Sequence, residues 1–216
     1  MTNTTSFAIV RLIEYLKKQR LVQLFAIFLR YLIGGAFIFA AVPKVLGERF
    51  TTMSVDTPVG FFFEAMYQTG FYWYFLGWAQ IAAALLLMTQ RFATLGAAIF
   101  FPIMLNIWLI TWSMGFKGTP VVTFLMFLAN TWLLLWDYRK LAPLFLRESR
   151  LSLLPSGFND AFMARPVWIW LGFGLALCSA LIRLDFNHAG LYIGGGFCVT
   201  MGFLVYGMST KMPAVN

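Results

Sequence analysis

Five residues of the first strongly apolar segment share one helical face and bring two cations into it. They are spaced four, three, four and three positions apart: Arg30, Gly34, Phe37, Ala41 and Lys44. In an α-helix this spacing stacks the side chains in one row. A guanidinium inside a membrane-spanning helix is costly unless it is paired or hydrated. The row therefore predicts either a packed helix interface with a polar partner or the wall of a binding site.

Amide side chains occur near the middle of three other apolar segments. Gln80, Asn106 and Asn130 fall at similar depth when residues are counted from the segment ends. One interpretation is interhelical hydrogen bonding, worth about 0.6 kcal/mol for each amide, with Arg30 bonded to the amides or to carbonyls. The other is a cavity in which Arg30 and the amides hold a polar head group, such as a quinone carbonyl. The amides alone favour the first interpretation, and the greater cost of burying Arg30 favours the second.

The long connection from Lys44 to Gly70 has the signals of a helix of its own. Thr57 is a suitable N-cap, Pro58 suits the first helical position, and Gly70 is a natural stop. The residues between them are too apolar for a free loop, so we expect a helix that folds back over the bundle and carries Glu64. It acts either as a lid over a cavity or as a surface connector. In the first case Lys44 and Glu64 would face the outer mouth of the cavity.

Composition identifies the elements that position these residues as membrane-spanning helices. Hydrophobic residues make up 61% of the 216 residues and charged residues only 11%, against about 25% charged in a soluble domain. A span needs roughly 20 apolar helical residues. The sequence predicts an all-α integral membrane protein with six spans: Leu24 to Pro43, Phe71 to Met88, Phe92 to Met114, Pro120 to Trp136, Val167 to Ile182 and Leu191 to Tyr206.

The positive charges sort by side of the membrane. The net charge is +8, but most of the Lys and Arg residues fall in the tails and loops of one side, while Lys44, Arg49, Lys117 and Arg183 fall on the other. An excess of positive charge stays in the cytoplasm, which predicts that both termini are cytoplasmic. Basic tails then face anionic lipid head groups. This distribution argues against nucleic acid as a partner.

The thiols and the histidine offer no ligand set for a metal or a haem. Cys178 and Cys198 lie in separate apolar segments, and His188 is the only histidine. A metal or redox motif needs closely spaced thiols, and a haem-carrying bundle of the bis-histidine type needs two histidines. We therefore expect two inert core cysteines, no metal site and no covalently attached cofactor.

Four regions follow along the chain. Residues 1–20 are expected to contain an amphipathic helix from Ser6 to Gln19, lying on the cytoplasmic membrane surface or docked on a protein partner. Residues 21–138 form the four-helix membrane core, residues 139–165 a cytoplasmic connector, and residues 166–216 a two-helix membrane extension.

The string RYLIGGAFIFAAVPKVLG, which starts at Arg30, resembles the first helix of the DoxX family of small bacterial membrane proteins. That helix typically has an arginine, a glycine one turn later, an aromatic residue and a closing lysine. The second helix agrees in Gly77, Ala84, Leu86 and Leu87, but Gln80 stands where the family commonly has a glutamate. The resemblance covers about residues 21–138 and implies a four-helix bundle associated with quinone-linked oxidation and membrane oxidoreductase complexes. The missing glutamate weakens any proton-transfer mechanism.

The sequence and this resemblance together predict an accessory subunit of an oxidoreductase complex in the bacterial inner membrane. It would have no catalytic residues of its own and would offer a lipid-accessible pocket for a quinone or similar amphiphile. The expected binding residues are Arg30, Gln80, Asn106, Asn130, Lys44 and Glu64, and the expected partners are membrane lipid and other membrane protein subunits. The alternative is a non-catalytic scaffold or assembly factor within a larger membrane complex, whose polar residues only specify packing. A transporter of small amphiphiles is a weaker third option, because no inverted repeat is evident.

Overall fold

The computed structural model describes residues 11–145 and 162–209, and all regular secondary structure in this part of the chain is helical, with no strand. Most of the predicted connector and the outer parts of both predicted tails lie outside the described residues. Six helices are long and apolar enough to cross a membrane, which confirms the all-α class and the six predicted spans. They are α2 Arg20–Val45, α4 Phe71–Met88, α5 Ala93–Ser113, α6 Thr119–Trp136, α9 Pro166–Leu184 and α10 Ala189–Ser209.

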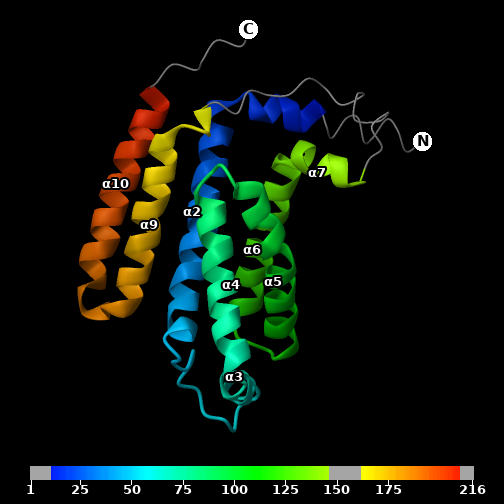
Figure 1. The fold of residues 1–216 in the computed structure, drawn as a ribbon, viewed down its shortest axis with the longest axis vertical. Helices are drawn as coiled ribbons and strands as arrows, with labels where there is room; N and C mark the ends of the chain where they lie inside the picture. Colours follow the sequence, from blue (N-terminus) through cyan, green and yellow to red (C-terminus); the bar gives the residue numbers. More distant parts are fainter. Residues whose placement is uncertain (1–10, 146–161, 210–216) are drawn as a thin grey trace.

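Helix α2 lies at the centre of the fold (Figure 1). It packs against α4 on one side and α9 on the other. Helix α5 packs between α4 and α6, and α10 packs against α9. Glycines allow the closest approaches: a Cβ added at Gly96 of α5 would lie 2.4 Å from the backbone nitrogen of Leu87 in α4. Such small residues let membrane helices pack backbone to backbone.

The predicted row on α2 is a buried interface face along its whole length. All five of its residues are buried in the described structure: Arg30, Gly34, Phe37, Ala41 and Lys44. A Cβ added at Gly34 would meet the side chain of Met88 in α4, and the ring of Phe37 lies 4.4 Å from that of Phe100 in α5. The row is thus the surface on which the core helices assemble, with a cation at each end.

The two ends of the bundle carry different short helices. At one end, here called the α3 end, α3 Pro58–Gln68 lies at the lower end of α4 and packs against the start of that helix (Figure 1). The hydroxyl of Thr57 accepts a hydrogen bond from the amide of Gly60 at 3.1 Å, which confirms the predicted cap and the position of Pro58. The opposite end, here called the α7 end, carries α7 Tyr138–Phe145 and the helical residues 11–17.

The helix over residues 11–17 is docked on the protein itself. The hydroxyl of Tyr138 donates to Glu14 at 2.8 Å, and the guanidinium of Arg139 pairs with the same carboxylate at 3.3 Å. Lys17 is only 5% exposed and lies over the ring of Tyr138. Glu14 therefore faces the corner between α6 and α7, which supplies its hydrogen-bond donors.

Helices α9 and α10 join the core through α9. Trp168 is fully buried, and its backbone carbonyl accepts a hydrogen bond from the hydroxyl of Tyr31 in α2. Helix α10 is the most exposed span, with 11% of its most apolar window buried. Large apolar side chains cover the outer surfaces of the spans, for example Leu32 and Trp170 at 70% and 73% exposed. The protein is therefore a multi-pass membrane protein whose outer helical faces contact lipid.

Candidate functional site

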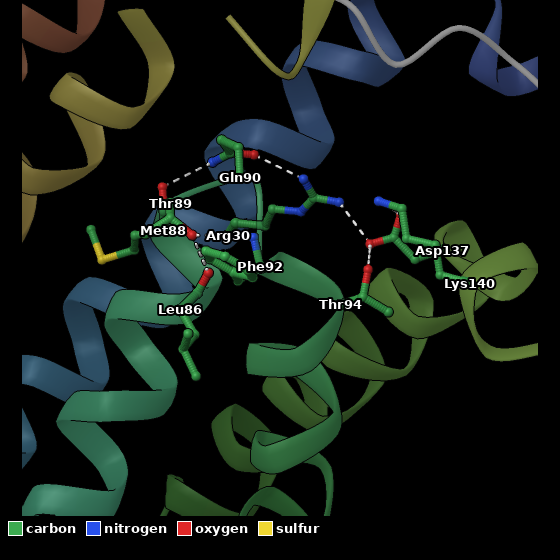
Figure 2. Close-up of polar contacts among 9 residues, drawn as sticks. All are labelled: Arg30, Leu86, Met88, Thr89, Gln90, Phe92, Thr94, Asp137 and Lys140. Carbon is green, nitrogen blue, oxygen red and sulfur yellow. Dashed lines mark hydrogen bonds and ion pairs between the residues drawn. The ribbon is translucent and has the colours of Figure 1, made fainter. Parts of the chain in front are cut away.

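Arg30 is the centre of a buried polar network at the α7 end (Figure 2). Its guanidinium donates to the amide oxygen of Gln90 at 2.8 Å and to the carboxylate of Asp137 at 3.1 Å. The same oxygen of Asp137 accepts a hydrogen bond from the hydroxyl of Thr94 at 2.8 Å. The other oxygen of Asp137 lies 3.5 Å from the ammonium of Lys140. The side chains of Arg30 and Asp137 are 3% and 6% exposed. A buried guanidinium and carboxylate thus neutralise each other across two helices.

Each member of this network comes from a helix end, except Arg30. Asp137 caps the C-terminus of α6, and Thr94 lies in the first turn of α5. Gln90 lies in the turn between α4 and α5 with φ of 61°, a left-handed conformation that is uncommon for a residue other than glycine. Long side chains in a helix lean toward its N-terminus. Arg30 therefore reaches from within α2 to the level at which the other helices end.

A partly enclosed cavity of about 150 Å³ adjoins the network. Arg30, Gln90 and Asp137 form part of its wall, and Trp136 contributes ring surface. The remaining lining residues are Arg91, Lys140, Met163 and Ala164. Three cations and one carboxylate therefore surround a space of about the size that holds a benzene ring in other proteins.

The three predicted amides do not meet Arg30. Arg30 bonds near the last turn of α4, whereas Gln80 lies eight residues before the end of that helix, about 12 Å deeper at the rise of an α-helix. Asn130 donates to the backbone carbonyl of Ala97 at 3.0 Å and so links α6 to α5. Asn106 is exposed and donates to the carbonyl of Pro102 in its own helix at 2.9 Å. The expectation that Arg30 is bonded to these amides is corrected by its contacts with Gln90 and Asp137.

Two of the amides nevertheless retain unused hydrogen-bonding capacity. Gln80 is 4% exposed and Asn130 is fully buried. The amide oxygen of each has no hydrogen-bond partner among the described residues. Buried amide oxygens normally find a donor, so these two positions in the membrane interior are places where a donor from water or a ligand would fit.

Lys44 and Glu64 both lie at the α3 end, but in different surroundings. The ammonium of Lys44 donates to the backbone carbonyl of Ala40 at 2.6 Å and is covered by the rings of Phe50 and Trp73. Glu64 is paired with Arg49 through two hydrogen bonds of 2.7 and 3.0 Å. That pair lowers the pKa of the Glu64 carboxyl below its ordinary value of 4.5, first through the hydrogen bond from Arg49.

The cysteines and the histidine are scattered, as their sequence positions suggest. Cys178 and Cys198 are both free thiols, but Cys198 is exposed on α10, which corrects the expectation that it lies in the core. The pattern predicted burial because the segment is apolar, and a membrane helix is apolar on its lipid-facing side as well. His188 pairs with Asp185 at 2.9 Å in the turn before α10. Within residues 11–145 and 162–209 no group of three or more His, Cys, Asp or Glu could hold a metal ion.

Sequence reasoning missed Gln90, Thr94, Asp137 and Lys140 as neighbours of Arg30. None of these four residues was among the predicted binding residues. One signal was present: the lean of a long side chain toward the start of its helix brings Arg30 toward the level of these helix ends. Counting depth at the side-chain tip rather than at the Cα would have placed the guanidinium beside them.

Comparisons with known proteins give one short match. No protein-family model matches the chain, and no solved structure matches it. An uncharacterized protein of Bacillus subtilis strain 168, YwoB, is 41% identical over 75 residues, which are 34% of this chain and 47% of that protein. The chain therefore spans about half the length of this curated relative. The match does not establish the DoxX resemblance, which stays a prediction.

Proposed function

We propose that this chain is an accessory subunit of a membrane oxidoreductase complex and that it holds the head group of a quinone or similar amphiphile. The observation that carries the proposal is the cavity of about 150 Å³ beside the buried Arg30 at the α7 end. Its volume suits one aromatic ring. Its lining combines hydrogen-bond donors with the ring of Trp136, the combination by which small-molecule sites orient a ligand.

Each residue of the cavity has a separate role in this proposal. Gln90 supplies the hydrogen bond to the ligand by turning its amide nitrogen away from its two present contacts, the carbonyl of Met88 at 3.4 Å and the hydroxyl of Tyr31. Arg30 supplies positive charge, and Asp137 holds the guanidinium in place. Of the residues predicted from the sequence, Arg30 keeps its role. Gln80 and Asn130 become candidates for a deeper contact through their unpaired oxygens, and the exposed Asn106 drops out.

The proposal includes an orientation. Helix ends at the α7 end carry Lys17, Arg20, Arg91, Arg139 and Lys140, whereas the α3 end carries fewer cations. The positive-inside rule then assigns the α7 end and both termini to the cytoplasm of a bacterial cell, with the spans in its inner membrane. The quinone head would be bound at the cytoplasmic surface. Electron transfer would depend on the cofactor of a partner subunit.

Purification from the native membrane in a mild detergent tests this proposal. Lipid-soluble molecules and polypeptides that remain with the protein are identified by mass spectrometry. We expect a quinone or similar amphiphile in stoichiometric amount, lost in Gln90→Ala and retained in Gln19→Ala, which changes an exposed glutamine at the same end. A protein that keeps its fold but carries no amphiphile in either form would overturn the proposal.

A scaffold or assembly factor is the second candidate, supported by the surface of α10. A Cβ added at Gly194, Gly195 or Gly202 would meet nothing within 4 Å. Close-packing glycines without a neighbour suit a helix that docks on another membrane protein. The same purification separates the candidates, because a scaffold retains a stoichiometric polypeptide and no amphiphile. Replacement of Gly195 by Leu would then release that polypeptide, whereas Gln90→Ala would not.

A further inference from the structure

The ammonium of Lys44 is buried at the α3 end without an anion. Lys44 is 4% exposed, and no carboxylate of the described residues lies within ion-pair distance of it. The ammonium of Lys44 donates one of its three protons in a hydrogen bond to the backbone carbonyl of Ala40. A buried ammonium is costly unless it is paired, so this position favours the arrival of an anionic group.

Lys44 cannot easily relieve this cost by moving outward. A Cβ added at Gly77 of α4 would lie only 2.9 Å from the Cβ of Lys44, so the backbone of α4 presses against the lysine stem. The ammonium bends back toward the start of α2 and lies over two rings, 4.4 Å from the centre of Phe50 and 5.5 Å from that of Trp73. Trp73 is fixed, because its indole nitrogen donates to the carbonyl of Glu48 at 3.0 Å.

Phe50 separates this ammonium from a larger pocket. The pocket has a volume of about 410 Å³ and lies between residues 49–55 and the face of α3 that carries Gly60, Phe63 and Glu64. Phe50 is on its wall, with its ring centre 5.0 Å from that of Phe63. Phe50 is 38% exposed, so its ring can turn without a change in the packing of the spans. One aromatic ring therefore stands between the pocket and Lys44.

The charges around the pocket suit an anionic ligand once the ring turns. Glu64 is the carboxylate on the pocket wall, and its pairing with Arg49 at 2.7 Å neutralises it. Lys44 then remains as the uncompensated charge behind the ring of Phe50. Three hydroxyl-bearing residues of the loop, Thr51, Thr52 and Ser54, are also among the residues that line the pocket.

We propose that Lys44 is the anion-binding group of a second site at the α3 end, which takes the phosphate of an amphiphile when the ring of Phe50 turns aside. The phosphate oxygens would pair with the ammonium, and the acyl chain would follow the apolar face of Phe63. The site is independent of the cavity beside Arg30. It also assigns to the residues 46–57 and α3 the role of a lid.

Lipid binding measured by native mass spectrometry tests this site. The full chain in detergent is titrated with a short-chain phosphatidylglycerol, and the Kd of the first bound lipid is compared between matched variants. We expect Lys44→Met to raise that Kd by about ten-fold or more, the size of a charge-assisted hydrogen bond. Lys117→Met, which changes an exposed lysine at the same end, should leave it unchanged.

A second pair of variants leaves the lysine in place. Phe50→Ala uncovers the ammonium and should lower the Kd several-fold, whereas Phe61→Ala, at an α3 residue that is 66% exposed, should not. Competition with inorganic phosphate distinguishes two forms of the site. Displacement of the lipid by phosphate indicates a site for phosphate alone, and no displacement indicates a site that also needs the lipid chain; both results are consistent with binding at Lys44. An unchanged Kd in folded Lys44→Met, or in Phe50→Ala, would overturn it.

Discussion

Arg30 and Asp137 are 107 residues apart in the chain and form a buried ion pair of 3.1 Å between α2 and the end of α6. The pair determines how the centre of the fold is held at the α7 end, because Asp137 also accepts from Thr94 of α5. Removal of Asp137 takes away the carboxylate to which this buried guanidinium is bonded.

Asp137→Ala should destabilise the protein by about 3 kcal/mol, the size expected when one partner of a buried pair is removed. The free energy of unfolding in detergent, measured by denaturant titration, checks this value. Lys140→Gln is the control, because the side chain of Lys140 is 49% exposed and its ion pair is worth little. Equal stability of Asp137→Ala and Lys140→Gln would mean that Arg30 is adequately hydrated without its partner.

Gln90→Gly should be more stable than Gln90→Ala by about 1 kcal/mol. Both variants lose the hydrogen bond to Arg30, so their difference reports the backbone alone. Gln90 has φ of 61°, a conformation that costs a residue with a Cβ roughly 1 kcal/mol and costs glycine nothing. Thermal unfolding of the two variants is the measurement. An alanine variant that is the more stable would show that the turn has another conformation in the protein.

Gly172→Ala should weaken the attachment of α9 to the core, whereas Gly174→Ala should not. A Cβ at Gly172 would lie 2.5 Å from the carbonyl oxygen of Met88, and a Cβ at Gly174 would meet nothing within 4 Å. Alanine also favours helix by about 1 kcal/mol over glycine, so Gly174→Ala should be neutral or stabilising. The melting temperatures of the two variants are compared, because both are glycine-to-alanine substitutions in α9.

Asn130→Leu should cost more than Asn106→Leu. Asn130 is fully buried and links α6 to α5 through the carbonyl of Ala97. Loss of such a bond costs about 0.6 kcal/mol, and leucine adds strain in the packed interface. Asn106 is exposed and bonds only within its own helix, so leucine there should be neutral or stabilising in lipid. Unfolding in lipid bicelles distinguishes the two variants, and the reverse order would contradict the assigned surroundings.

The loop that precedes α3 should become more mobile in acid. The pairing with Arg49 lowers the pKa of Glu64 below its ordinary value of 4.5. The stabilisation that the Arg49–Glu64 pair gives the loop is therefore fully present above about pH 4.5 and is lost as the pH falls through the lowered pKa of Glu64. Hydrogen exchange of residues 46–57, corrected for the intrinsic rate, should be constant near neutral pH and rise in acid. Glu64→Gln should show the raised exchange at pH 7, where wild type does not.

The sequence by itself determined the elements of this protein. The six spans, the helix that starts at Pro58 and the buried row on α2 follow from hydropathy, capping chemistry and helical spacing, and the structure has all three. These properties depend on residues within a few turns of one another. They can therefore be predicted from the sequence without knowledge of how the helices pack.

Only the tertiary structure decided which polar residues meet. Counting along the sequence assigns Gln80, Asn106 and Asn130 to one depth, yet Asn130 bonds to Ala97, nine residues along α5 from Asn106, and Arg30 bonds to Gln90 and Asp137. The rotation of each helix about its axis selects the partner, and that rotation is not encoded in spacing along one helix. The same holds for Lys44, whose ammonium is covered by Phe50 and Trp73 from two other segments. Local sequence fixes which faces are available, and long-range packing fixes which groups fill them.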